Sequence, residues 1–309
     1  MEPSPTQKAK KPGLNKTYNM HYTRRKFLSD TALLGSGLFL FGTDLFAATP
    51  LEPGKIRSYG IQLYTLRDIL PADPFGIIKK LREAGYSSLE SYEGASGVYW
   101  GKSPKEFSNF LRDLELTMPS FHCNVFENLE KKVADAAEAG VQYVICPWLG
   151  PQKSLDDYKK AADRFNEMGA LCKKNGLRFA YHNHDYSFKP MGGTIPQTIL
   201  LENTDPKLVS FEMDIYWVVA AGADPIEWFE RYPNRFRLVH VKDRSKKPVA
   251  DESKNSVVIG TGTIDFASIL NTGRSKGLKE LIVEQEANYG KGPLEAAVAG
   301  LKYLQEKKY

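Results

Sequence analysis

The sequence predicts an α/β protein that folds as a single closed (β/α)₈ barrel, and three observations support this prediction. Short strand-like runs recur roughly every 25 to 35 residues, and amphipathic stretches with helical periodicity lie between them. Eight such units occupy about 250 residues, which is the usual size of this barrel. No Gly-x-Gly-x-x-Gly motif follows the first strand, which disfavours the main alternative, an open doubly wound sheet.

The eight strands are expected where β-branched and aromatic residues cluster between turn residues. In chain order they are Ser58–Tyr64, Ser87–Tyr92, Met118–Cys123, Tyr143–Pro147, Arg178–His182, Leu208–Asp214, Arg237–Lys242 and Leu281–Gln285. Strands that alternate with helices pair in parallel, because each helix returns the chain to the same end of the sheet. In such a barrel the functional residues lie at the carboxyl ends of the strands.

Amphipathic periodicity predicts helices in the segments between these strands. The clearest ones are Phe75–Ala84, Pro104–Leu114, Leu129–Ala139, Leu155–Asn175, Ala267–Lys276 and Pro293–Glu306. Gly85, Gly140, Gly176 and Gly277 fall just past four of them, where a left-handed residue commonly ends a helix. No linker divides the barrel into two domains.

The first 48 residues are expected to be an N-terminal extension that contains an export signal, with the barrel over residues 49–309. The segment Thr23–Leu28, which contains the basic residues 24–26, precedes an apolar run, Ala32–Phe41, and small residues follow it. The paired arginines resemble the twin-arginine motif, which implies export of the folded protein by the twin-arginine machinery to the periplasm. The apolar run is shorter than the about 20 residues of a membrane-spanning helix. An uncleaved anchor or a cytoplasmic protein stays open as the alternative.

Most of the net positive charge belongs to this extension. The chain has 42 basic and 37 acidic side chains, and the extension holds seven and three of them. The remaining 261 residues therefore carry 35 and 34, which is close to neutral. Nucleic-acid binding needs a dense basic surface, so we expect no nucleic-acid partner.

Four successive strands each end near a residue that offers a nitrogen or oxygen ligand. These residues are His182, Asp214, His240 and Glu284. Because parallel strands end at one rim of a barrel, we expect the four side chains to converge there. Two imidazoles and two carboxylates suit one divalent ion such as Mn²⁺, Co²⁺ or Zn²⁺, with positions left open for a substrate. Taken alone, Asp214 could simply cap the helix that follows it.

The strand-end motifs are Tyr-His-Asn-His-Asp-Tyr at 181–186, Phe-Glu-Met-Asp-Ile-Tyr-Trp-Val-Val at 211–219, Val-His-Val-Lys-Asp at 239–243 and Ile-Val-Glu-Gln at 282–285. Together with residues 60–67 and 260–266 they resemble the xylose-isomerase-like sugar isomerase/epimerase superfamily of TIM barrels. The resemblance implies one divalent metal, with Mn²⁺ preferred, held by a Glu/Asp/His/Glu set from strands five to eight. The chain matches this set at Asp214, His240 and Glu284 and departs from it at His182, which replaces a glutamate.

The resemblance also implies an enzyme, an isomerase or epimerase that removes a proton beside the carbonyl of a sugar. In the superfamily both metal-bound glutamates move this proton, so the change at His182 leaves Glu284 as the expected base. His182 or His184 is its expected acid partner, and Lys242 is expected to stabilise developing negative charge. A one-base elimination, as in relatives that resemble 3-keto-glycoside lyases, is the alternative reaction.

Further residues at the same rim are expected to contact the sugar: Gln62, Glu90, His122, Trp148 and Trp217. The export signal favours a non-phosphorylated sugar, because phosphorylated sugars are cytoplasmic. The segment Gly260–Thr263 could cradle a phosphate, although a tight turn with Asp265 as helix cap is the favoured interpretation. The long segments 186–194 and 243–258 are expected to cover the site.

Two functions of other classes stay open. A nuclease of the apurinic endonuclease branch is disfavoured by the near-neutral barrel. A non-catalytic periplasmic sugar-binding protein would be expected to lack a bound metal and to keep its ligand without Glu284. The sugar, the oligomeric state and the cleavage position of the signal are not defined by the sequence.

Overall fold

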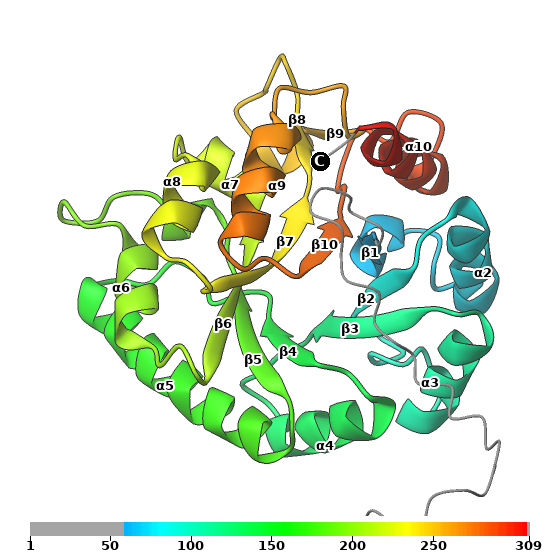
Figure 1. Ribbon diagram of the computed structural model, residues 1–309, viewed down its shortest axis with the longest axis horizontal. Coiled ribbons are helices and arrows are strands. Elements are labelled where there is room, and N and C mark those ends of the chain that lie inside the picture. The colour runs from blue at the N-terminus through cyan, green and yellow to red at the C-terminus, as the bar shows by residue number, and fades with distance from the viewer. Residues whose placement is uncertain (1–58, 308–309) are drawn as a thin grey trace, which may run out of the picture. The chain divides into compact units, whose positions relative to one another are not determined.

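The computed structural model describes residues 59–307, which form a closed barrel of eight parallel strands surrounded by helices (Figure 1). Each barrel strand pairs in parallel with its two neighbours, and the last strand pairs with the first. The predicted barrel is therefore confirmed. The predicted extension of residues 1–48, with its export signal, lies outside the described residues.

The barrel strands are β1 (Gly60–Gln62), β2 (Ser88–Tyr92), β3 (Thr117–His122), β4 (Tyr143–Cys146), β5 (Arg178–His182), β6 (Val209–Asp214), β7 (Phe236–Val241) and β10 (Glu280–Val283). Their ends differ from the predicted ends by two residues at most. The difference is largest at β1, because the chain turns directly into a 3₁₀ helix, η1 (Leu63–Leu66), whose first turn is capped by the Gln62 side chain.

Six helices match the predicted ones closely: α2 (Pro74–Ala84), α3 (Pro104–Asp113), α4 (Leu129–Ala139), α5 (Leu155–Lys174), α9 (Phe266–Ser275) and α10 (Pro293–Glu306). Gly85 and Gly140 end two of them in the left-handed conformation, with φ of 109° and 76°. The short helices α6 (Pro196–Asn203), α7 (Ile215–Ala220) and α8 (Pro225–Arg231) were not predicted. Helix α7 reads Ile-Tyr-Trp-Val-Val-Ala, and an entirely apolar segment has no periodicity to detect.

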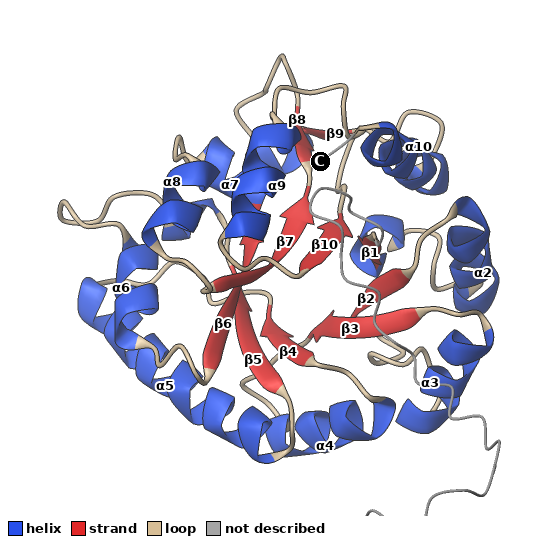
Figure 2. Ribbon diagram, viewed as in Figure 1, coloured by secondary structure: helices blue, strands red, loops and turns tan. Residues whose placement is uncertain are grey.

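The segment that follows β7 contains a two-stranded antiparallel ribbon, β8 (Asp243–Arg244) and β9 (Ser256–Val257) (Figure 2). A 3₁₀ helix, η3 (Glu252–Lys254), lies between the two strands, and a third one, η2 (Asp185–Ser187), follows β5. These short elements order the loops on the carboxyl side of the barrel, where the candidate site lies.

The inside of the barrel changes from apolar to polar along its axis. A buried apolar cluster from four strands comprises Tyr143, Ile145, Ala180, Leu238 and Ile282. Side chains of a strand alternate between its two faces, so the residues two positions further along also point inward. On β5 and β7 these are His182 and His240, and Glu284 directly follows β10. Within residues 59–307 we find no helix with the length and apolar character needed to cross a membrane.

Candidate metal centre

The four predicted metal ligands converge at the carboxyl end of the barrel. His182 Nε2 lies 3.2 Å from His240 Nδ1 and 3.5 Å from Asp214 Oδ2. His240 Nδ1 lies 3.1 Å from Glu284 Oε2 and 3.9 Å from Asp214 Oδ2. All four residues are buried, and their ligand atoms lie within 4.8 Å of one another. The structure thus brings these four predicted residues together.

The spacing of these atoms can be compared with that around a divalent ion. Ligands about 2.1 Å from a metal, in tetrahedral or octahedral arrangement, lie about 3.0–3.4 Å from each other. The four separations of 3.1–3.9 Å are close to this range. Burial lowers the pKa of His182 to about 4, so its imidazole is neutral at pH 7 and can donate a lone pair. The donor set therefore fits one divalent ion.

Asp214 combines the two roles that the sequence left open. Its Oδ1 accepts a hydrogen bond from the Trp217 backbone N–H at 3.2 Å and caps α7. Its Oδ2 faces His182 and lies 3.4 Å from Lys242 Nζ. The cap fixes the orientation of the carboxylate, because one oxygen is committed to the helix while the other faces the cluster.

Lys242 is a buried cation in contact with the same carboxylates. Its Nζ donates to Glu284 Oε2 at 3.1 Å and contacts Glu286 Oε2. Burial alone would lower the pKa of Lys242, but the charges of Asp214 and Glu284 raise it well above its usual value. For the same reason Lys242 and His240 hold the pKa of Glu284 well below normal despite burial. Lys242 is therefore a buried part of the site and not an exposed lysine at the barrel rim.

A second buried cluster lies on the other side of the His240 ring. His240 Nε2 is 2.8 Å from Glu90 Oε1 and 3.4 Å from Glu212 Oε2. His122 Nε2 bridges the same two carboxylates, at 3.1 and 2.7 Å. The Gln62 amide donates to Glu90 Oε1 at 2.7 Å. Glu90 and Glu212 thus contact His240 Nε2 and fix the orientation of the ring, while Nδ1 faces the metal ligands.

The structure places Gln62 and Glu90, which were expected to contact the sugar, beneath the cavity and not in its wall. Both side chains are fully buried, and neither lines the cavity described below. Their polar atoms are engaged with each other, with His240 and with the Ser120 hydroxyl. The sequence could not distinguish inward-pointing residues that reach the cavity from those that lie one layer beneath it.

We expect Glu90→Gln to weaken divalent-metal affinity about 10–100-fold, because a carboxylate on the second nitrogen of a metal-bound histidine fixes its orientation and basicity. Titration of metal-free protein with Co²⁺, followed by visible absorption, measures this affinity without an activity assay. Thermal melting of the metal-free variant is the control. A lower melting temperature with unchanged Co²⁺ affinity would mean that Glu90 only supports the fold.

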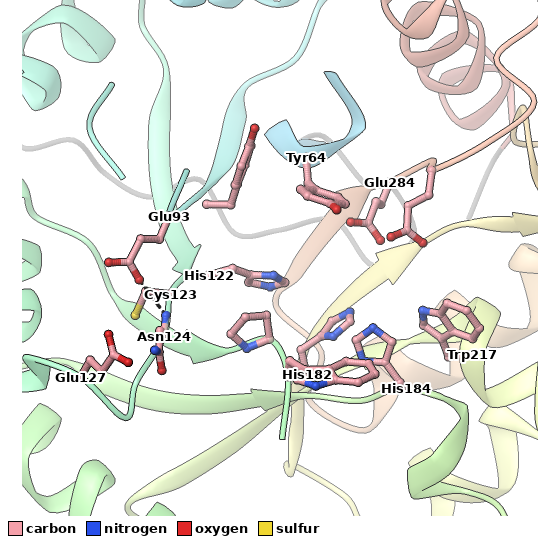
Figure 3. Close-up of a pocket in the computed structure, with 14 residues that line it drawn as sticks. Tyr64, Glu93, His122, Cys123, Asn124, Glu127, His182, His184, Trp217 and Glu284 are labelled. Carbon is pink, nitrogen blue, oxygen red and sulfur yellow. Dashed lines mark hydrogen bonds between the residues drawn. The ribbon is translucent and has the colours of Figure 1, made fainter. Parts of the chain in front are cut away.

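The metal cluster opens into a cavity of about 520 Å³ (Figure 3). His182 and Glu284 reach this cavity, together with the predicted residues His122, His184, Trp148 and Trp217. It is also lined by residues that the sequence analysis missed, among them Tyr64, Tyr92, Glu93, Asn124, Glu127 and Glu286. Several of these residues directly follow the end of a strand, and this position in the sequence could have identified them as cavity residues.

The His184 ring packs against aromatic side chains. The Trp148 ring meets it edge to face at 4.6 Å between centroids, and the Tyr186 ring stacks on it at 5.9 Å. Burial, together with the positive charge of Lys242, lowers the pKa of His184 well below its usual value. The imidazole is therefore neutral at pH 7 and can donate or accept one hydrogen bond at the cavity wall.

The glycine-rich segment before α9 does not present a free phosphate cradle. Asp243 Oδ2 accepts hydrogen bonds from the backbone N–H groups of Gly260, at 2.9 Å, and Gly262, at 2.8 Å. Its Oδ1 accepts from the N–H of Ile264. Backbone donors that could bind a phosphate are thus occupied by a carboxylate of the chain itself. Asp265 caps α9, as the turn interpretation predicted.

Comparison with known proteins gives matches over most of the described residues. The sequence model of the family described as "Xylose isomerase-like TIM barrel" matches residues 78–307. An inosose dehydratase of Clostridium perfringens (strain 13 / Type A) is 32% identical over 172 residues, 49% of this chain and 55% of that protein. An inosose dehydratase of Lacticaseibacillus casei is 29% identical over 261 residues, 70% of this chain and 86% of that protein. The chain thus spans about half the length of the first curated relatives that it matches.

Solved structures give a similar result. The crystal structure of a sugar phosphate isomerase/epimerase from Parabacteroides distasonis ATCC 8503 superimposes with a TM-score of 0.70 and 30% sequence identity. The match covers 84% of this chain and 96% of that one.

Proposed function

The chain belongs to the xylose isomerase-like TIM barrel family, and on that premise we propose that it is a divalent-metal-dependent enzyme acting on a non-phosphorylated keto sugar derivative. We propose further that it removes the proton beside the carbonyl and then eliminates the group on the next carbon. One observation carries this choice: of the two carboxylates among the four clustered ligands, only Glu284 lines the cavity. A one-base reaction fits such a site.

The metal would be held by His182, Asp214, His240 and Glu284. A bound divalent ion would polarise the substrate carbonyl and lower the energy of the enediolate that follows proton removal. Glu284 is ionised at pH 7 and faces the cavity, so its carboxylate can take the proton. Lys242 fixes Glu284 Oε2 by a hydrogen bond and keeps positive charge beside the position where negative charge develops.

The elimination balances without a further reactant. The C–H electrons first form the enediolate, and they then form a double bond to the carbon that carries the leaving group. The bond from that carbon to the leaving oxygen breaks, and the oxygen takes the electron pair and a proton. The proton is the one that Glu284 removed, and we propose His184, whose neutral ring lines the cavity, as a hydrogen-bond donor to this oxygen.

Epimerisation is the second candidate reaction, since the similar Parabacteroides structure bears the name of an isomerase/epimerase. That reaction needs a second base on the opposite face of the substrate. His182, at the expected position, faces the other ligands through Nε2, so this nitrogen would hold the ion and would not be free to take a proton. Elimination is therefore the better supported reaction, and the inosose dehydratases named above also carry the name of an elimination.

The proposed absence of a phosphate from the substrate rests on Asp243, which occupies the backbone donors of Gly260 and Gly262. A phosphate placed there would have to displace a buried carboxylate of like charge. The twin-arginine motif supports the same choice, and with it we propose a periplasmic location.

Two measurements test the proposed function. Purified protein is expected to contain about one divalent ion per chain, and a chelator is expected to abolish activity, which added Mn²⁺ restores. Protein that contains no divalent ion yet binds sugars would instead support a sugar-binding protein.

The reaction type is tested by incubation with 3-keto-glycosides and free ketoses in heavy water. We expect release of the group at C1, with loss of the C2 proton. Recovery of intact sugar with deuterium beside the carbonyl, and without release of that group, would support the epimerase and contradict the elimination.

A further inference from the structure

A second cavity of about 540 Å³ adjoins the cavity at the metal centre. Five residues line both cavities: Tyr64, Trp148, His184, Trp217 and Glu286. The second cavity is completed by Arg67, Asp185, Ser253, Lys254 and Ala287. Because these five residues belong to both linings, the two cavities are neighbours, and we call the five residues the boundary.

The metal centre lies between this boundary and the part of the first cavity that Glu93 and Glu127 line. His182 and Glu284 line the first cavity and not the second. In Figure 3 Glu93 and Glu127 lie on one side of His182, and Trp217 lies on the other. A substrate that reacts at Glu284 therefore has space on both sides of its reacting carbon. A cavity of about 300 Å³ already accommodates a small ligand, so 520 and 540 Å³ together exceed the need of a single sugar ring.

The boundary carries aromatic rings that are unusually accessible. Trp148 is 55% exposed and Tyr64 is 39% exposed. The Arg67 guanidinium lies 4.6 Å from the Tyr64 ring centroid and donates to the Glu286 carbonyl at 2.8 Å, which holds it in place. An exposed aromatic face beside fixed polar groups is suited to a ring that has an apolar face and a polar edge.

The far wall of the second cavity is polar. It is formed by η3 and η2, which contribute Ser253, Lys254 and Asp185. Hydroxyl, ammonium and carboxylate groups can bond the hydroxyls of a sugar, whereas an apolar group would leave them without partners.

From these observations we infer that the second cavity is a subsite for a second sugar ring, so that the substrate is a glycoside of at least two rings. Its linkage would cross the boundary beside Trp148. The inference rests on the proposed function in one respect: only the proposed elimination makes the ring in the second cavity the leaving group. The binding of a second ring there does not depend on the reaction.

Binding to metal-loaded protein tests the inference without turnover. The probes are glucose and the disaccharides cellobiose, maltose and trehalose, and affinity is measured by calorimetry. We expect at least one disaccharide to bind tenfold or more tightly than glucose. Ser253→Trp, which fills the second cavity from an exposed position, is expected to remove this preference and leave the glucose affinity unchanged. Val249→Trp is the matched control, since Val249 is 54% exposed on the same segment and lines neither cavity.

Equal affinities of glucose and all disaccharides in the wild type would overturn the subsite, as would a disaccharide preference that survives Ser253→Trp. Tighter binding of 4-nitrophenyl glucoside than of every disaccharide, lost in Ser253→Trp, would replace the second sugar by an aromatic group and overturn the assignment. A disaccharide preference without release of a sugar from the 3-keto-disaccharide would retain the subsite and contradict only the proposed elimination.

Discussion

Replacing Glu284 by glutamine is expected to lower turnover about 10²–10⁴-fold, which is the usual contribution of a positioned general base. The amide keeps the size of the side chain but cannot take the substrate proton. Glu284 also offers one of the four clustered ligand atoms, so metal affinity is expected to fall as well. The assay therefore uses saturating Mn²⁺, and metal content is measured in parallel, so that loss of the base is separated from loss of the ion.

Glu280→Gln is the matched control for this experiment. Glu280 lies on the same strand, β10, at its opposite end, away from the barrel mouth. Glu280 lines neither cavity and is not one of the clustered ligands, so the same chemical change there is expected to leave turnover within about twofold of wild type. A metal-loaded Glu284→Gln enzyme with turnover within tenfold of wild type would contradict the assignment of Glu284 as the base.

The parts of the site that the sequence predicted are those that follow from strand periodicity. His182, Asp214 and His240 are the last or nearly the last residues of strands β5, β6 and β7, and a barrel brings such ends together by its symmetry. The helices with a clear amphipathic pattern were predicted for the same kind of reason. The entirely apolar α7 was not, because tertiary burial on all sides removes the pattern.

The parts that were not predicted depend on contacts between distant residues. Glu90 contacts His240, which lies 150 residues further along the chain, and no local sequence pattern predicts this contact. Likewise, the sequence favoured a tight turn over a phosphate cradle for segment 260–263, but it did not reveal that the Asp243 carboxylate occupies the backbone donors there. In both places a side chain from another strand decides which of two local interpretations holds.

Lys242→Met is expected to lower the free energy of unfolding of the metal-free protein by about 3–5 kcal/mol. Lys242 is 1% exposed, and its Nζ contacts Asp214, Glu284 and Glu286. Removal of this cation leaves three neighbouring carboxylates without its charge in a region that water barely reaches. Lys131→Met is the control: that lysine forms an exposed ion pair with Asp135, and such pairs contribute about 0–1 kcal/mol.

Divalent metal is expected to restore part of the stability that Lys242→Met loses, because the ion would be held by Asp214 and Glu284, two of the carboxylates that Lys242 contacts. An ion that binds only the folded state stabilises it in proportion to the logarithm of its concentration over its dissociation constant. Denaturant unfolding of wild type and variant, each with and without Mn²⁺, measures the difference. If Mn²⁺ stabilises the two proteins equally, the lysine and the metal do not act on the same carboxylates. A larger Mn²⁺ stabilisation in the variant would instead place both cations on one acidic pair, where Lys242 moderates metal affinity while it holds Glu284 for proton removal.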